Sequence, residues 1–72
     1  MRQNAGMDIH LNGQRQAIEP NSTLSSLLLH EGLAERRVAV EVNGEIIPRG
    51  QHPTLRLQHG DRIEIVHALG GG

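Results

Sequence analysis

Apolar and polar residues alternate in three stretches of the chain. The alternation covers residues 7–11, 38–42 and 62–68, and a period of two is typical of a strand with one buried face. In the last stretch Ile63 and Ile65 point one way, so the side chains between and after them point the other way. The pattern therefore predicts three main strands, each with one face toward a core.

Two Asn-Gly pairs predict tight turns. Asn12-Gly13 and Asn43-Gly44 directly follow the first two strands, and both central residues of a type I′ hairpin turn need positive φ. We therefore expect return strands over residues 14–18 and at residues 46–47. Pro48 has no backbone donor, so the second return strand is expected to lie at a sheet edge or to end there.

A leucine-rich stretch between the first hairpin and the next strand predicts one short helix. Thr23 is placed as its N-cap, and Leu24, Leu27 and Leu28 fall on one face at helical spacing. Gly32 is placed to end the helix in the left-handed conformation. Two turns are marginal alone, so this helix is expected to pack on the sheet.

The predicted order is hairpin, helix, strand, short strand and strand. A helix between a hairpin and later strands gives an α+β fold, a mixed four- to five-stranded sheet with one helix packed on one face. The last strand is expected to add parallel to the first, with these two strands in the middle. The segment "RGQHP", residues 49–53, is expected to be a loop.

Composition excludes several classes of function. The chain has 72 residues, 36% of them hydrophobic, with no aromatic residue and no cysteine, so disulfides, thiolate metal sites and a thiol nucleophile are excluded. The net charge is −1, the arginines are scattered and no aromatic ring can stack on a base, which argues against nucleic-acid binding. No apolar stretch reaches about 18 residues, so no membrane segment is expected. The absence of a leader pattern favours a cytoplasmic protein.

The histidines and three serines are the candidate site residues of the chain. No histidine pair has the helical spacing of a zinc site, so we expect surface imidazoles and no bound metal. The serines Ser22, Ser25 and Ser26 surround the predicted helix start, where capping explains them. No catalytic residue is predicted. The five histidines are His10, His30, His52, His59 and His67.

The sequence ends in "HALGGG", immediately after the last predicted strand. Three glycines do not stabilise a terminus, because glycine loses the most conformational freedom on folding. They suit a slim, mobile arm that carries a terminal carboxyl group. We therefore expect three parts: a disordered extension over residues 1–6, a domain over residues 7–68, and a flexible arm over residues 69–72.

Two segments carry a resemblance to a known family. The stretches "VEVNGEIIPR", residues 40–49, and "LQHGDRIEIVHALGGG", residues 57–72, resemble the β-grasp family of ubiquitin-like proteins. Within that family they are most similar to the ThiS-type sulfur carriers of thiamine thiazole biosynthesis. His52 stands about where relatives often have an aromatic residue, and the leader before Met7 is atypical. Neither departure touches the tail.

The resemblance implies a chemistry for the tail. A ThiF-like adenylyltransferase, using ATP and Mg, would activate the carboxylate of Gly72. Sulfur from a sulfur donor enzyme would then replace the adenylate and leave a thiocarboxylate for a ThiG-like thiazole synthase. Leu69, Gly70 and Gly71 would form the arm that reaches the enzyme. The chain would be a monomeric protein co-substrate that binds no cofactor itself.

The face of the sheet away from the helix is the expected docking surface for these partners. Val66 and Ala68 are predicted to lie there beside Leu69, with one of Ile46 and Ile47 added. Contiguous exposed apolar groups on such a face indicate a partner surface.

Three alternatives remain at this point. The small subunit of molybdopterin synthase has the same fold and tail, but its relatives tend to be longer, with aromatics and prolines before the glycines. A ubiquitin-like protein modifier is a second alternative. The chain has no lysine to accept a chain-forming tag, which favours a small-molecule sulfur donor. The third is an interaction module with an inert tail.

Overall fold

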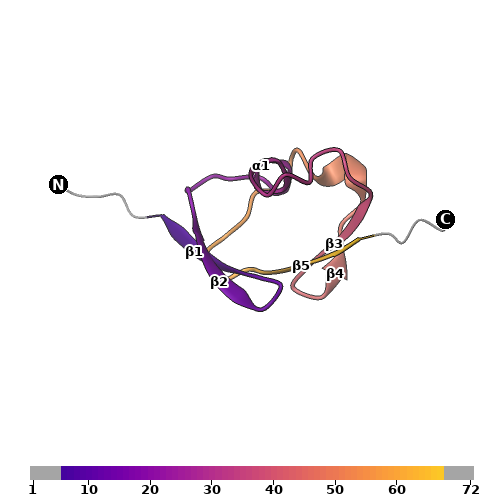
Figure 1. The fold of residues 1–72 in the computed structure, drawn as a ribbon. Coiled ribbons are helices and arrows are strands. Elements are labelled where there is room, and N and C mark those ends of the chain that lie inside the picture. The colour runs from indigo at the N-terminus through magenta and orange to yellow at the C-terminus, as the bar shows by residue number, and fades with distance from the viewer. Residues whose placement is uncertain (1–5, 68–72) are drawn as a thin grey trace.

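The computed structural model describes residues 6–67, and the elements within that range are one sheet and one α-helix (Figure 1). The predicted extension, apart from Gly6, and the predicted arm over residues 69–72 lie outside this range, as does Ala68. The elements in chain order are β1 (Met7–Leu11), β2 (Gln14–Ile18), α1 (Leu24–His30), β3 (Val38–Val42), β4 (Glu45–Ile46), the 3₁₀-helix η1 (Arg49–Gln51) and β5 (Arg62–His67).

The two predicted hairpins are confirmed. β1 pairs antiparallel with β2, and β3 pairs antiparallel with β4. The turn residues take positive φ, 50° at Asn12 and 54° at Asn43, each followed by a glycine at 86°. Such angles are accessible to asparagine and glycine at low cost. The second return strand is Glu45–Ile46 rather than Ile46–Ile47, one residue earlier than predicted.

The predicted caps of α1 are confirmed at both ends. The Thr23 hydroxyl accepts from the Ser26 backbone N–H, and the Ser26 hydroxyl accepts from the Thr23 N–H, a reciprocal pair that satisfies two free donors. At the other end Gly32 has φ 77°. The Leu33 N–H then reaches back to the Leu28 carbonyl at 2.8 Å, which closes the helix in a Schellman-type end.

The segment after Pro48 differs from the sequence prediction. Residues 49–53 were expected to be a loop, but Arg49–Gln51 forms η1, with the Gln51 N–H donating to the Pro48 carbonyl at 2.9 Å. Pro48 itself lies just past β4, the edge strand, as expected from its missing donor.

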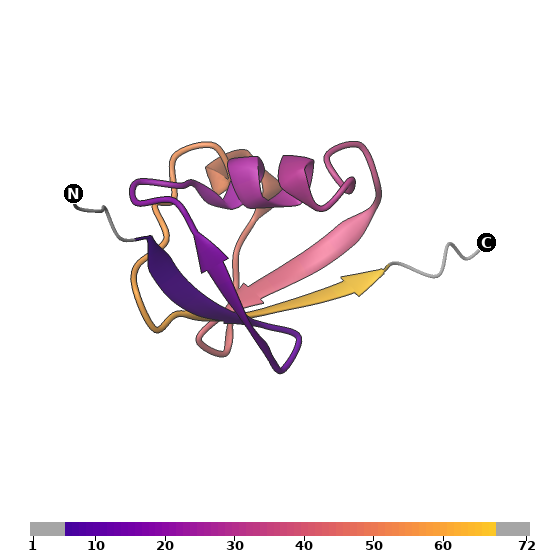
Figure 2. The same cartoon turned by 60° about the vertical axis from the view of Figure 1, so that its left-hand side comes forward.

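The strand order is β2-β1-β5-β3-β4, with β5 in the middle. β5 runs parallel to β1, as predicted, and antiparallel to β3. Figure 2 shows α1 lying across one face of the sheet. The prediction of an α+β fold, a mixed sheet with one helix on one face, is confirmed, and the sheet has five strands.

The core lies between α1 and the sheet and is entirely aliphatic. Ile9, Leu24, Val40 and Ile63 are completely buried. Burial of one such side chain contributes about 1.5–3 kcal/mol. The full set of buried hydrophobic residues is Ile9, Leu11, Leu24, Leu27, Leu28, Val40, Val42, Leu57, Ile63 and Ile65.

Candidate functional site

The strand that leads into the glycine tail, β5, is held by side chains from both hairpin turns. The Asn12 Oδ1 atom accepts from the Ile65 N–H at 2.8 Å, and the Asn43 Oδ1 atom accepts from the Arg62 N–H at 2.9 Å. The Asn43 amide also donates to Asp61 at 3.0 Å. The two turns therefore fix the position of β5 in the sheet, and with it the point at which the chain continues beyond His67.

The face of the sheet away from α1 carries an apolar patch. Val66 is 59% exposed and Ile46 is 65% exposed. Val66 stands directly opposite Ala39 on β3, and Ile46 stands opposite Glu41. We call Ala39, Glu41, Ile46, Glu64 and Val66 together the outer patch.

The sequence did not decide which of Ile46 and Ile47 lies on the docking face, and the structure does. Ile46 belongs to the outer patch, whereas Ile47 is half-buried and packs against the core. The Ile47 N–H also donates to the Val40 carbonyl at 2.9 Å. Ile47 is therefore a packing residue in this fold and is not part of the outer patch. Ala68 and Leu69, the other predicted docking residues, lie outside the described residues, as do Gly70, Gly71 and Gly72.

Two carboxylates interrupt the outer patch. Glu41 on β3 and Glu64 on β5 are direct cross-strand partners, and like charges in that position repel each other. Sequence reasoning did not single out these residues. The alternation of both strands would have found them, because it places Glu41 and Glu64 on the same face as Val66.

One of the five histidines is buried, contrary to the expectation of surface imidazoles. His52 is 6% exposed, and its Nε2 atom lies 3.0 Å from the Ile47 carbonyl. A buried ring nitrogen needs such a partner, so His52 joins η1 to the end of β4. The other four histidines are exposed. Among residues 6–67 no three histidine or acidic side chains are grouped closely enough to hold a metal.

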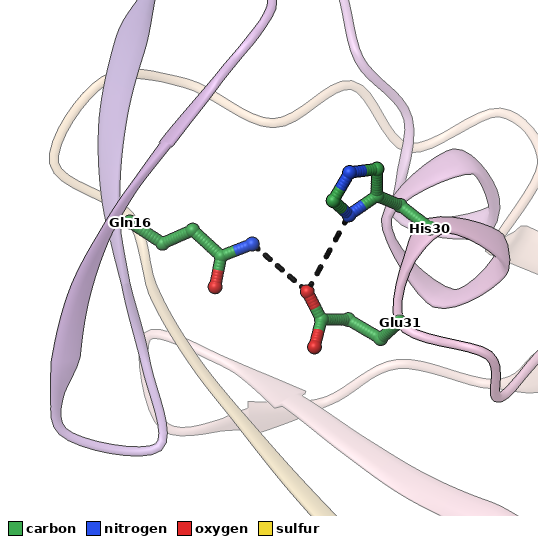
Figure 3. A network of polar contacts seen from close by, with 3 residues as sticks. All are labelled: Gln16, His30 and Glu31. Atoms are coloured by element: carbon green, nitrogen blue, oxygen red, sulfur yellow. Dashed lines mark hydrogen bonds and ion pairs between the residues drawn. The ribbon is translucent and has the colours of Figure 1, made fainter.

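A small polar network ties α1 to β2 (Figure 3). Glu31, at the end of the helix, accepts a hydrogen bond from the Gln16 side chain at 2.8 Å, and the same oxygen lies 3.6 Å from His30 Nδ1. The hydroxyls of Ser22 and Ser26 are used in local bonds to Glu19 and Thr23. These two serine contacts serve the fold, since both hydroxyls bind the backbone of their own segment. The Ser25 side chain takes no part in the cap, which is formed by Thr23 and Ser26.

No helix in the described part of the chain is long and apolar enough to cross a membrane.

A family model described as the ThiS family matches residues 9–72. Among solved structures, the crystal structure of a thiamine biosynthesis protein (ThiS) from Geobacter metallireducens is similar, with a TM-score of 0.80 and 28% sequence identity. The similarity covers 92% of this chain and 100% of that one.

Two curated relatives are named thiazole synthase. The protein from Magnetococcus marinus is 46% identical over 66 residues, and the protein from Paramagnetospirillum magneticum is 36% identical over 66 residues. Each match covers 92% of this chain, and the chain spans 20% of the length of each of these two relatives.

Proposed function

The chain belongs to the ThiS family, and from this membership we propose that it is a sulfur carrier protein of thiamine biosynthesis. The observation that carries the proposal is the extent of the family match. It begins in β1 and continues through β5 to Gly72, so it includes the glycine tail as well as the β-grasp domain.

The proposed reaction occurs at the terminal carboxylate of Gly72. A carboxylate is a poor electrophile, so a ThiF-like enzyme uses ATP and Mg to convert it to an acyl adenylate, with release of pyrophosphate. A sulfur donor enzyme supplies the sulfur that attacks the carbonyl carbon, AMP leaves, and a thiocarboxylate remains. The arm formed by Leu69, Gly70 and Gly71 is narrow because glycine has no Cβ. It carries the reacting carbon into a site that excludes water, which would otherwise hydrolyse the adenylate.

In this proposal the chain is a co-substrate and the catalytic groups belong to its enzymes. The local roles of Ser22 and Ser26 in the helix cap support this division. Each serine oxygen is already committed to a backbone partner, whereas a nucleophile needs an adjacent base and an orienting group.

Thiazole synthase is the proposed acceptor of the sulfur. Two proteins of that name contain a region similar to this chain, and a solved relative is named as a thiamine biosynthesis protein. These names favour the thiamine pathway over the molybdopterin pathway, which shares the fold and the tail.

The outer patch is the proposed docking surface for the activating enzyme. Val66 and Ile46 expose apolar side chains on the face of the sheet away from α1. Val66 belongs to β5, the strand from which the chain continues to Ala68 and Leu69. An enzyme that accepts the arm comes close to this face, and burial of the exposed Val66 and Ile46 side chains favours the complex.

Intact-mass analysis tests the proposal. The chain is incubated with the adenylating enzyme, ATP, Mg and a sulfur source. A mass increase equal to exchange of one oxygen for one sulfur is expected, and it should be absent without ATP. A chain that lacks Gly72 should show no exchange and no pyrophosphate release, with unchanged thermal stability, whereas a chain that lacks residues 1–6 should react normally. Exchange in the chain without Gly72 would refute the proposal.

A further inference from the structure

A second surface feature lies on the helix side of the sheet, outside the outer patch. It is a cleft of about 240 Å³ between α1, the segment that leads from α1 into β3, and η1 with the residues that follow it. Aliphatic side chains, among them Leu28, Leu33 and Val38, line one part of it. Arg36, Arg49 and His52 line another part. We call this feature the arginine cleft.

The two arginines of the cleft have no internal counter-charge within the described residues. The Arg49 guanidinium donates to the backbone carbonyl of Arg36 at 3.1 Å. Across residues 6–67 the ion pair between His30 and Glu31 is the one found within 4.0 Å. No carboxylate oxygen in residues 6–67 lies within 4.0 Å of either guanidinium group. Glu35, next to Arg36, lines the hollow beside the cleft but not the cleft itself. Two cations at one cleft without a paired carboxylate favour an external anion. The planar guanidinium group suits a carboxylate in particular, because it can donate two parallel hydrogen bonds.

The surface beside the arginine cleft is apolar as well as cationic. Ala34 and Arg36 also border a shallow hollow that includes Leu29, whose side chain is 69% exposed. A free inorganic anion has no apolar group that could bury the exposed Leu29 side chain. An acidic side chain of a protein, next to an aliphatic residue of the same protein, matches both parts of this surface.

The arginine cleft lies near the strand end that leads to the glycine tail. Val38, which lines the cleft, is the cross-strand partner of His67, the last described residue of β5. A protein that accepts the tail therefore comes close to the cleft. Glu41 and Glu64 lie on the opposite face of the same strands, where they share a hollow with Arg62.

We propose that the arginine cleft binds an acidic side chain of the enzyme that activates Gly72, with an aliphatic neighbour of that side chain covering Leu29 and Ala34. This proposal rests on the proposed function, since it assumes that such an enzyme takes the tail. A charged contact at the cleft, added to apolar contact at the outer patch, restricts the orientation of the enzyme on the domain. They also accelerate the encounter, because complementary potentials steer diffusion.

Charge reversal with a matched control tests the proposal. Arg36→Glu should weaken binding of the activating enzyme by about tenfold or more, since it places like charges together. Arg37→Glu makes the same change one residue away, at an exposed arginine that does not line the cleft, and should weaken binding less than about threefold. Dissociation constants are measured by isothermal titration calorimetry at low and high salt. The difference between the two variants should shrink at high salt.

Further variants keep the test decisive. Ala34→Glu adds a negative charge at the cleft without removing a hydrogen bond and should also weaken binding, and circular dichroism verifies that each variant is folded. Equal weakening by Arg36→Glu and Arg37→Glu would overturn the cleft proposal, while normal exchange of oxygen for sulfur in the wild-type chain would leave the proposed function intact. Failure of the wild-type chain to bind or react would overturn both.

A titration with inorganic phosphate, followed by NMR, tests whether the cleft binds a free anion instead of an acidic side chain of the enzyme. Saturable shifts of the Arg36 and Arg49 signals at submillimolar phosphate would assign the cleft to a free anion and overturn the protein occupant. Shifts that stay linear with phosphate concentration are the expected result.

Discussion

β5 is one strand of six residues, but its two faces differ in exposure, because α1 covers one of them and not the other. Ile63 is completely buried and Ile65 is 8% exposed under α1, whereas Val66, next along the strand, is 59% exposed. All three are aliphatic, so hydrophobicity alone does not determine their role. The difference follows from the single helix, which covers one face and leaves an apolar side chain on the other. A residue's contribution to stability and its contribution to partner binding are therefore separable along β5.

The largest expected effect is on the covered face. Ile63→Ala should lower the free energy of unfolding by about 2–5 kcal/mol, because it removes buried methyl groups and leaves a cavity. Val66→Ala, on the exposed face, should change it by less than about 1 kcal/mol. Urea denaturation of both variants measures the difference. Similar losses for the two would mean that the faces are not distinct.

A smaller effect is expected on the exposed face, and in binding rather than in stability. Val66→Arg should weaken the complex with the activating enzyme by about tenfold, which corresponds to about 1.4 kcal/mol. The free energy of unfolding should change by no more than about 1 kcal/mol, the span of strand propensities. Calorimetric titration and urea denaturation give the two quantities. An unfolded Val66→Arg chain, or one with undiminished affinity, would contradict the assignment of this face.

The smallest expected effect concerns the carboxylates of the outer patch. Glu64→Gln should raise the free energy of unfolding by a few tenths of a kcal/mol at low salt, since it removes the repulsion from Glu41. The gain should fade at high salt as the charges are screened. Glu45→Gln is the control, because Glu45 is paired with Val42 and faces no carboxylate. An equal gain in the control would show that general charge, and not the cross-strand pair, is responsible.

Local patterns in the sequence were sufficient to predict most elements of the fold. Alternation located β1, β3 and β5, and the Asn-Gly pairs located both hairpins, because each depends on neighbours a few residues apart. The start of α1 at Thr23 and its end at Gly32 were equally local. The central, parallel position of β5 followed from the order of elements and the length of the crossover.

Features that depend on distant contacts were not predicted. His52 lies beside α1, where the Ser25 N–H donates to the His52 carbonyl at 3.0 Å across 27 positions, and no periodicity indicates its burial. The bond from Ile65 to Asn12 spans 53 positions in sequence. The arginine cleft likewise needs η1 to bring Arg49 beside Arg36, and η1 itself was expected to be a loop. The glycine tail was recognised from its sequence and its family, and it lies outside the described residues.

The central position of β5 has a mechanical consequence. In the proposed function, an enzyme that draws the tail into its active site would pull on β5 along the strand axis. β5 is bonded to β1 on one side and to β3 on the other, so this tension loads two ladders in shear at once. An edge strand under the same pull would be held by one ladder only. The strand next to the tail is therefore held by two neighbours, and this arrangement opposes the extraction of β5 by a force on the tail.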